Sequence, residues 1–578
     1  MAKSIWVCSR KELPKSVYND LSDICQALTP DNIIPAEPVI QVNGKVAFGI
    51  MNPTRTISIR GNSLLMGKIL DEKENWHIPM EDFPDGSYAL FRDGDGYCEI
   101  VSDPVASRTI WYYMDNEVFV ASTSQRAIIL FIGGFEFNEE VIPWMLSTGS
   151  LGPRLSWDKR ISQLAPDSSV ILDKKSWTTR QVHNPIHFST DQDPDKNHEE
   201  DFLNTLKSTF RSLELNFDDW VLPLSGGYDS RGILCLLHET GKTKDLQTIT
   251  WGLKSSVHDK NNDAWVAKKL AETFDLPHKY FHTDVTEEPM HKILNRFLLN
   301  GEGRVDHVSG YMDGFKIWKT LYDNNIQGII RGDVGFGGMQ ISSPFTVRRE
   351  VGFQLCTDFI NLANYTDYKI PIQKIPEYLE LKPGESLETW RDRLYDDFRL
   401  PTVQAALSDL KLSYVEIVNP FLFRKILGSV RELPDFHRTG KTLFKKIVNF
   451  LSPDIHYAKI DATAKEQDIL KQRSFVELIR QELTSNYAEK IFAEEFLKSV
   501  LENITVAQGK NAQQQKNKPS LKSTIKNIMP IWLINAIRDK VPATTKIGPN
   551  LLAFRIFIII RMYRLLSTEK SEKLPEVP

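Results

Sequence analysis

Six consecutive residues, Ser225 to Ser230, carry the clearest chemistry in this sequence: two hydroxyls enclose two glycines, a tyrosine and an acid. They follow an apolar run that ends at Leu224, and an apolar helical pattern follows them. Glycines let backbone N–H groups approach an anion, and a helix N-terminus adds positive partial charge. An acid in such a loop would repel a phosphate unless a divalent cation joined the two. The run therefore predicts a nucleotide site in which Asp229 contacts a metal ion.

A second acid is expected at the same place. Residues 326–330 form an apolar run that ends in Arg331, Gly332 and Asp333. Ligands of parallel sheets bind beyond the carboxyl ends of the strands, so Asp333 is expected near Ser225. Two carboxylates there would hold Mg²⁺ and, through it, the phosphates of ATP.

The elements that position these residues begin with a β-rich region, 1–188. Short β-prone runs are separated there by turn signals such as Pro84-Asp85-Gly86. The expected strands are 46–50, 57–59, 87–91, 97–101 and 118–121, with a closing hairpin at 169–173 and 178–182. Strands at this spacing favour packed antiparallel sheets, which indicates an α+β domain built as an antiparallel sandwich.

Residues 199–470 show another pattern, in which helices and strands alternate. This order is typical of an α/β domain with a parallel sheet and crossover helices. Strands are expected at 220–224, 246–251 and 326–330, and helices at 202–213, 231–238 and 264–274. The polar passage 189–197 is the best linker candidate, and residues 345 to about 500 look mainly helical.

The C-terminal part, 471–578, is expected to be a helical and partly basic extension. Its segment 510–546 is polar and net basic, and the apolar run 551–566 follows it. Arg555 and Arg561 interrupt that run, so it is a poor membrane span. A packed helix that closes the domain is the simpler interpretation. Peripheral contact with an anionic membrane surface is the alternative.

Composition excludes several classes of protein. A chain of 578 residues with a net charge of −4 is large enough for about two or three domains and is not a general nucleic-acid binder. Its five cysteines are far apart and form no CxxC, which favours neither a disulfide framework nor a zinc site. With no signal peptide in view, we expect a cytoplasmic protein. The sequence indicates no oligomeric state.

The run Ser225–Ser230 fits the SGGxDS loop of the asparagine synthetase family of ATP-pyrophosphatases. The sequence from Gly332 to Gly338 is similar to that family's GxGADELFGG segment, and Glu416 with 420–422 resembles its ExRxPFL stretch. Residues 441–459 resemble its K-rich segment. In the first domain, 85–89, 102–104 and 161–166 resemble landmarks of its glutamine amidotransferase (Ntn) half.

The resemblance implies a degenerate class II amidotransferase domain followed by a synthetase domain. ATP would adenylate a carboxylate, pyrophosphate would leave, and an amine would attack the acyl-adenylate. The implied nucleotide-binding residues share the loop or the second strand end, and they are Leu224, Ser225, Gly226, Gly227, Asp229, Ser230 and Gly332. Asp229 and Asp333 would hold Mg²⁺. Lys459 would place a positive charge near the leaving group, with Lys441 as the runner-up, and Glu416 is a second catalytic candidate.

Departures from the family pattern restrict the reaction. Position 2 is Ala2 where working glutaminases have a cysteine, so we expect no glutamine hydrolysis. The family's β-lactam synthetases have a tyrosine where Ile330 stands, and the acid that usually follows the metal aspartate is replaced by Val334. The missing tyrosine argues against β-lactam formation, and Val334 is a further departure from the family pattern. Members without glutaminase activity also include lasso-peptide cyclases.

The sequence thus predicts an ATP-dependent amide ligase that joins a small-molecule or peptide carboxylate to an amine, within one molecule or between two. Amidation with ammonia in surface-polysaccharide or secondary metabolism is one alternative. A catalytically silent nucleotide-binding scaffold is another. Nitrogen or sulfur insertion into tRNA is disfavoured by the missing CxxC and the near-neutral charge.

Overall fold

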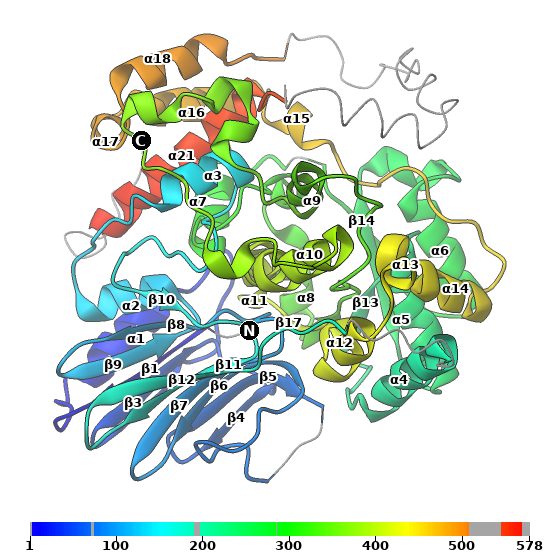
Figure 1. The fold of residues 1–578 in the computed structure, drawn as a ribbon, viewed down its shortest axis with the longest axis horizontal. Coiled ribbons are helices and arrows are strands. Elements are labelled where there is room, and N and C mark those ends of the chain that lie inside the picture. Colours follow the sequence, from blue (N-terminus) through cyan, green and yellow to red (C-terminus); the bar gives the residue numbers. More distant parts are fainter. Residues whose placement is uncertain (1–2, 71–73, 190–196, 285, 508–544, 569–578) are drawn as a thin grey trace.

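The N-terminal part of the protein is a sandwich of two six-stranded sheets in which all neighbouring strands are antiparallel (Figure 1, lower left). The structure, a computed structural model, describes residues 3–70, 74–189, 197–284, 286–507 and 545–568. The sheets have the strand orders β10-β8-β9-β1-β3-β2 and β12-β11-β7-β6-β5-β4. Their strands are β1 (Lys3–Ser9), β2 (Val39–Asn43), β3 (Val46–Met51), β4 (Ile57–Arg60), β5 (Ser63–Ile69), β6 (Gly86–Asp93), β7 (Tyr97–Ser102), β8 (Trp111–Met114), β9 (Val118–Ser122), β10 (Ser162–Gln163), β11 (Ser168–Asp173) and β12 (Thr178–His183). The antiparallel sandwich and its predicted strands are confirmed.

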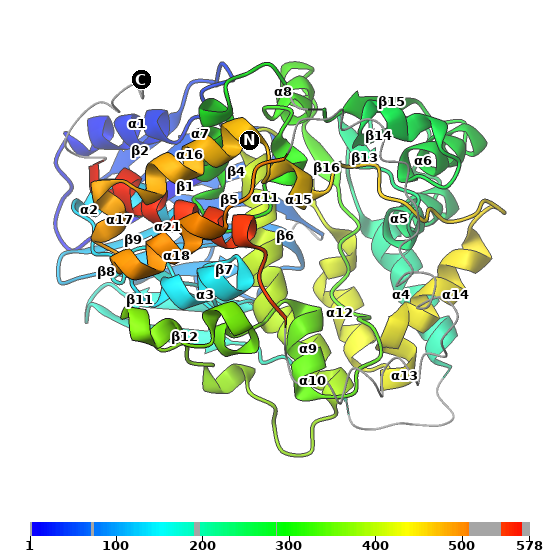
Figure 2. The same cartoon turned by 90° about the horizontal axis from the view of Figure 1, so that it is seen from above.

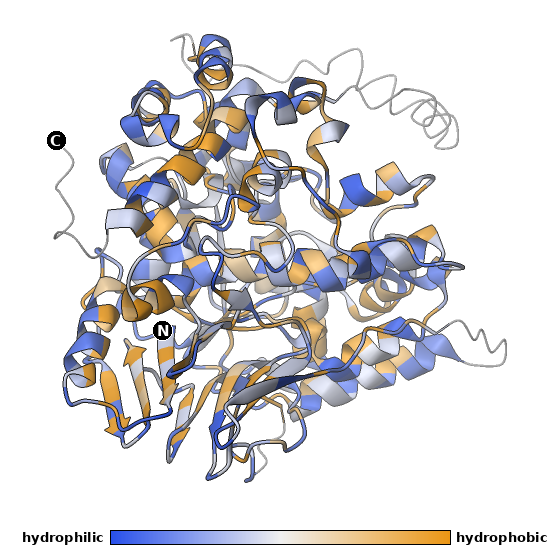
Figure 3. Cartoon of the chain, turned by 60° about the vertical axis from the view of Figure 1, so that its left-hand side comes forward, coloured by the Kyte–Doolittle hydropathy of each residue, from blue (hydrophilic) through white to orange (hydrophobic). Residues whose placement is uncertain are grey.

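Strand β1 is buried on both faces, and this explains why its sequence does not alternate between apolar and polar residues. Trp6 packs in the core between the two sheets. Ile5 and Val7 point the other way and pack in a second core that includes helices α1 (Val17–Ala27) and α2 (Gln125–Ile132). Successive side chains of a strand point to opposite faces, so a strand covered on both sides needs apolar residues throughout. Figure 3 shows such hydrophobic residues, in orange, within the strands.

The second part contains a parallel sheet of order β15-β14-β13-β16-β17. Its strands are β13 (Trp220–Pro223), β14 (Gln247–Gly252), β15 (His278–His282), β16 (Gly328–Ile330) and β17 (Glu416–Val418). Helices α4 (His198–Ser212), α5 (Tyr228–Glu239) and α6 (Asp263–Thr273) lie where the alternating pattern predicts them. The parallel sheet is therefore confirmed. Strand β17 is only three residues long and lies in the stretch from 345 to about 500, for which the sequence predicts mainly helices.

The sandwich is attached to the parallel-sheet part through residues around β17. Asp85 accepts hydrogen bonds from the backbone N–H groups of Arg424 (2.6 Å) and Lys425 (3.1 Å), at the start of helix α12 (Arg424–Arg431). A carboxylate at a helix N-terminus satisfies unpaired N–H groups and complements the helix dipole. The backbone N–H of Asn419 also donates to the hydroxyl of Ser87 (3.3 Å). The two parts therefore meet in a specific polar contact beside the end of β17.

The last described helix, α21 (Pro549–Thr568), is packed inside the protein and 14 of its 20 residues are buried. It lies against α3 (Val141–Thr148), α16 (Arg473–Leu483) and α18 (Glu494–Asn503) (Figure 2). This is the packed helix of the simpler interpretation. Among the residues that the structure describes, no helix has the length and hydropathy needed to cross a membrane. Most of the predicted linker 189–197 and of the basic segment 510–546 lies outside the described residues.

Candidate active site

The loop between β13 and α5 is closed by its own hydroxyl groups. The backbone N–H of Ser225 donates to the hydroxyl oxygen of Ser230 (3.0 Å), and the two hydroxyl oxygens also lie 3.0 Å apart. The N–H of Gly227 donates to the hydroxyl oxygen of Ser225 (3.2 Å). Helix α5 begins directly after Gly227, which has no side chain to cap it. The N-terminal end of α5 is thus suited to an anionic ligand.

Two glycines are required here by close approach of the backbone. A Cβ atom on Gly226 would lie 2.4 Å from the Cβ of Ala458. One on Gly332 would lie 2.9 Å from the carbonyl carbon of Asp229. Because Gly332 follows the end of β16, its contact with Asp229 places the end of this strand beside the first turn of α5. This close approach places the next residue, Asp333, near the loop.

A cavity of about 300 Å³ opens at this edge of the sheet. The predicted residues that line it are Leu224, Ser225, Asp229, Ser230, Gly332 and Asp333. Other walls come from Trp251 at the end of β14 and from residues 461–463. A volume of this size lies at the lower end of the range for small-molecule sites. The loop and both predicted metal acids therefore face one pocket.

Each of the two acids has a cationic partner. The amine of Lys441 lies 2.8 and 2.7 Å from the two carboxylate oxygens of Asp229. Asp333 accepts hydrogen bonds from the Nη2 of Arg331 (2.8 Å) and from the side-chain amide of Asn419 (2.9 Å). A longer one comes from Gln404 (3.4 Å).

The surroundings of the two acids shift their pKa values in opposite directions. Burial raises the pKa of Asp229, Lys441 opposes the rise, and the negative charge of Asp333 adds to it. Burial also acts on Asp333, but Arg331 holds the pKa of that carboxyl below its ordinary value. A carboxylate whose charge is disfavoured by burial and by a second carboxylate, as for Asp229, is one that a divalent cation would stabilise.

The donor set fits a magnesium ion only if the ligand supplies most of its oxygens. Among the described residues, no group of three or more His, Cys, Asp and Glu side chains could hold a metal ion. Asp229 and Asp333 provide two carboxylates at one pocket. Magnesium in nucleotide sites is commonly held by one or two carboxylates together with phosphate oxygens and water. Two acids are therefore enough when a nucleotide is bound.

The structure places the two candidate lysines differently. Lys459 lies in a bend. Its backbone N–H donates to the carbonyl of Asn261 (2.8 Å), and its side chain is exposed. Its neighbour Ala458 faces Gly226 instead. Lys459 is not among the residues that line the cavity, whereas the runner-up, Lys441, contacts Asp229. The catalytic role of Lys459 stays a prediction.

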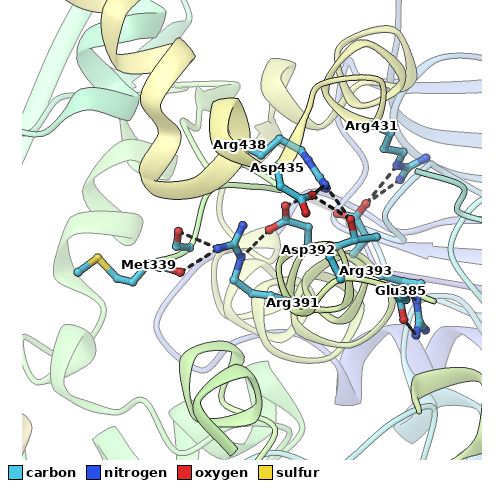
Figure 4. Close-up of polar contacts among 12 residues, drawn as sticks. Met339, Glu385, Arg391, Asp392, Arg393, Arg431, Asp435 and Arg438 are labelled. Carbon is cyan, nitrogen blue, oxygen red and sulfur yellow. Dashed lines mark hydrogen bonds and ion pairs between the residues drawn. The ribbon is translucent and has the colours of Figure 1, made fainter. Parts of the chain in front are cut away.

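A buried ionic network joins Arg391, Asp392 and Arg438 (Figure 4). Arg391, on α10 (Leu387–Leu394), donates from Nη1 to the carbonyls of Gly338 (3.1 Å) and Met339 (2.8 Å), in the glycine-rich segment after Asp333. The carboxylate of Asp392 joins Arg391 (2.8 Å) to Arg438 (3.0 Å).

The chain from Arg438 to Lys441 is fixed to that same glycine-rich segment. The N–H of Gly440 donates to the carbonyl of Gly338 (2.8 Å). Gly440 and Lys441 both have positive φ, 64° and 57°. A Cβ on Gly337 would lie 2.3 Å from the Cγ of Lys441, so the lysine stem fits only over a glycine. This turn directs the lysine amine toward Asp229.

Glu416 lies at the contact between the two parts of the protein. Its carboxylate pairs with Arg108 (2.5 Å) and accepts a hydrogen bond from the hydroxyl of Thr56 (3.0 Å). It also lines a cavity of about 20 Å³, large enough for roughly one water molecule, that Asp333 borders from the other side. Glu416 is not among the residues that line the larger pocket. Its catalytic role stays a prediction.

Sequence reasoning did not assign roles to Arg331, Asn419 or Gln404. Arg331 directly precedes the Gly332–Gly338 segment, and Asn419 lies between Glu416 and Pro420. Their places directly after two parallel strands were the signal that could have found them. Gln404 ends a π-helical segment, Tyr395–Gln404, that contains Pro401. No signal in the sequence indicates that this segment bends toward Asp333.

Comparisons with known proteins add little to this description. No family model matches the chain, and no curated protein does. Among solved structures, the chain is similar to an allosteric regulatory enzyme of purine biosynthesis, with 12% identity, a TM-score of 0.20, and coverage of 38% of this chain and 60% of that one. It is also similar to the glutamine phosphoribosylpyrophosphate amidotransferase from B. subtilis complexed with ADP and GMP, with 12% identity, a TM-score of 0.19, and coverage of 48% and 65%. The chain thus spans less than two thirds of either protein, and we infer function from the site alone.

Proposed function

We propose that this protein is an ATP-dependent amide ligase that forms an acyl-adenylate and releases pyrophosphate. The observation that carries the proposal is the meeting of the Ser225–Ser230 loop, Asp229 and Asp333 at one pocket, with Lys441 paired to Asp229. Cleavage between the α and β phosphates leaves a pyrophosphate whose negative charge must be stabilised as it develops. The hydroxyls of Ser225 and Ser230 and the N-terminal end of α5 would stabilise it, because the N–H groups of Ser225, Gly226 and Gly227 already donate to side chains of the protein.

Each side chain has a defined task in this proposal. Asp229 and Asp333 would hold Mg²⁺, which neutralises charge on the phosphates. Lys441, which pairs with Asp229 in this structure, would supply a positive charge for the leaving pyrophosphate. Arg331 would keep Asp333 ionised, because the guanidinium lowers the pKa of that carboxyl. The carboxylate substrate and the amine would approach from the open side of the pocket.

The amine is proposed to come from the substrate or from a free donor, not from glutamine hydrolysed by this chain. Cys8 lies in β1 and is 1% exposed, so its thiol is not accessible to a glutamine. Lys3, near the start of β1, is also buried and donates to the carbonyl of Asn300 (2.9 Å).

Pyrophosphate release tests the proposal. It is measured with the purified protein, ATP and Mg²⁺ in the presence of panels of acids, amino acids and peptides as candidate substrates. We expect release that depends on both a carboxylate and an amine. Asp229→Asn should reduce it by at least about 10²-fold, the scale for losing one group that stabilises charge in the transition state. Lys446→Met is the matched control, because Lys446 pairs with Glu199 at an exposed position. ATP binding without release for any panel would contradict the ligase.

That last outcome would instead support a nucleotide-binding scaffold, and one observation favours this second candidate. Both oxygens of Asp333 already accept hydrogen bonds from protein donors. A carboxylate held in this way binds a metal ion only if some of these donors move. Arg331→Gln would remove one protein donor from each oxygen of Asp333. Stronger Mg²⁺-dependent ATP binding together with faster release would favour the ligase, whereas stronger binding alone would favour the scaffold.

A further inference from the structure

Asp263 is an acid of the nucleotide pocket that has no task in the proposed reaction. It is the first residue of helix α6 and lines the pocket of about 300 Å³. The N-cap of α6 is the preceding residue, Asn262, whose side chain accepts from the backbone N–H of Ala264 (3.0 Å). Capping therefore does not explain Asp263. Its Oδ1 accepts instead from the backbone N–H of Gly226, in the Ser225–Ser230 loop (3.0 Å).

Backbone contacts hold Asp263 in this position. Its own N–H donates to the carbonyl of Ile460 (3.0 Å). The side-chain amide of Asn262 donates to the carbonyl of Asp461 (3.0 Å). A Cβ on Gly226 would lie 3.1 Å from Oδ1 of Asp263, so the carboxylate packs closely against the loop. A carboxylate that is already oriented binds a ligand with little further loss of conformational freedom.

The second oxygen of this carboxylate is open. Within the part of the chain that the structure describes, Oδ2 of Asp263 accepts no hydrogen bond and forms no ion pair. Buried side-chain oxygens without a partner occur in the protein, but Oδ2 of Asp263 is not one of them, so this atom is accessible. Burial raises the pKa of Asp263, the N–H of Gly226 opposes the rise, and the negative charge of Asp461 adds to it. The ionised carboxylate therefore lacks a donor that a ligand in the pocket can supply.

The charge of Asp263 determines which part of a nucleotide can lie beside it. Asp461 lines the same pocket, and among the described residues no lysine or arginine pairs with either acid. Two unpaired carboxylates would repel phosphate oxygens. Hydroxyl groups, in contrast, donate short, charge-assisted hydrogen bonds to a carboxylate. The hydroxyl groups of a nucleotide are those of its ribose.

The place of Asp263 relative to the sheet agrees with a contact to the sugar. Strand β14, which precedes α6, pairs with β13, the strand that leads into the Ser225–Ser230 loop. A nucleotide whose phosphates lie at this loop would extend across the neighbouring strand end. In dinucleotide-binding folds, an acid farther along the chain than the phosphate-binding turn hydrogen-bonds a ribose hydroxyl in this way.

We propose that Asp263 is a specificity-determining residue, whose Oδ2 accepts a hydrogen bond from a ribose hydroxyl of the bound nucleotide. This inference rests on the nucleotide-binding part of the proposed function. Oδ1 holds the loop through Gly226 while Oδ2 takes the hydroxyl, so one carboxylate joins the sugar to the phosphate-binding loop. A nucleotide without that hydroxyl would leave Oδ2 in the pocket without a partner.

Calorimetric titration of the full chain with ATP, 2′-deoxy-ATP and 3′-deoxy-ATP, each with Mg²⁺, tests the contact without a ligase assay. At least one deoxynucleotide should bind about tenfold or more weakly than ATP, the scale for losing one hydrogen bond to a charged group. Equal affinities for all three would overturn this inference and leave the proposed function standing. No binding of ATP would contradict the proposed function and this inference with it.

Asp263→Asn separates the two tasks of the carboxylate, because its amide oxygen can still accept from Gly226 while its NH₂ group replaces the second acceptor. The variant should bind ATP about tenfold more weakly, and its preference for ATP over the weaker deoxynucleotide should fall to about twofold or less. Asp461→Asn is the matched control: it removes the neighbouring charge of the same pocket, and the preference for ATP should persist in it.

Two results with Asp263→Asn would overturn the proposal. An unchanged preference for ATP would mean that the acid only anchors the loop. Unchanged ATP affinity together with a raised KM for the amine would assign Asp263 to the second substrate instead. The comparison of the three nucleotides in the wild type needs no variant, so it decides the case even if Asp263→Asn does not fold.

Discussion

Two carboxylates near the parallel sheet have cationic partners, but only one of these two pairs is open to a ligand. Glu416 and Arg108 join the sandwich to the parallel sheet, and their side chains are 3% and 4% exposed. Asp229 lines the larger pocket and pairs with Lys441, and the side chains of Asp229 and Lys441 are 34% and 21% exposed. The first pair is closed by Thr56 and by the surrounding fold. The second pair can separate when a ligand brings its own charges. The comparison teaches that access, and not the pairing itself, distinguishes a binding pair from a structural one.

Breaking the closed pair should have the largest effect on stability. Arg108→Met leaves the Glu416 carboxylate buried without its cation, and loss of one partner of a buried pair costs about 3–5 kcal/mol. Denaturant unfolding measures this loss. The double variant Arg108→Met, Glu416→Leu should recover part of it, because no unpaired charge is left. Equal losses of unfolding free energy in the single and double variants would contradict this account, because they would mean that Arg108→Met does not leave Glu416 as a buried, unpaired charge.

Asp396 is a third carboxylate with a cationic partner. It is buried, and its Oδ2 lies 3.0 Å from Nη2 of Arg431. Burial raises the pKa of Asp396 from 3.8 to about 7, against the opposing effect of Arg431. A carboxyl whose pKa is higher in the folded protein favours folding at low pH, and this contribution is lost as pH rises from about 4 to about 7. Each tenfold change in proton affinity corresponds to about 1.4 kcal/mol.

Asp396→Asn mimics the protonated carboxyl, so its Tm relative to the wild type should increase between pH 4 and pH 8. Glu385→Gln is the control, because Glu385 pairs with Arg393 elsewhere in the same region. A difference in Tm that stays constant or falls with pH would contradict the burial of an ionisable Asp396.

Arg391 and Arg393 allow a similar comparison between two buried arginines of the same helix, α10. Both are buried, at 1% and 2% exposure, and both bind a carboxylate and backbone carbonyls. Only Arg391 reaches the segment against which Lys441 packs (Figure 4). Replacing either with Met should cost about 2–3 kcal/mol, the scale for hydrogen bonds to charged groups. Only Arg391→Met should also lower kcat/KM for ATP in the pyrophosphate assay. Equal kinetic losses would mean that the network does not position Lys441.

The sequence predicted the main elements of both domains because they depend on local signals. The β-prone runs with their turns and the glycine loop between a strand and a helix are examples. What it could not predict depends on distant contacts or on backbone conformation. A lysine gives no sign that its backbone will adopt the left-handed conformation found at Lys441. The resemblance to the family therefore placed Lys459 before Lys441 as the candidate for the positive charge. The burial of Arg555 and Arg561 depends on Asp306 and Glu482, far away in the sequence, so a membrane surface remained a reasonable alternative.

The open pair gives the smallest effect on stability and the clearest effect on function. Because Lys441 and Asp229 are partly exposed, solvent screens their attraction, and Lys441→Met should cost no more than about 1 kcal/mol. The same variant should lower pyrophosphate release about 10²- to 10³-fold, since the amine would no longer stabilise the leaving group. Lys459→Met, measured beside it, tests the sequence prediction directly. If Lys459→Met abolishes release and Lys441→Met leaves it intact, then the segment around Lys459 must close over the pocket when ATP binds, and Lys441 serves only to hold Asp229 in the ligand-free protein.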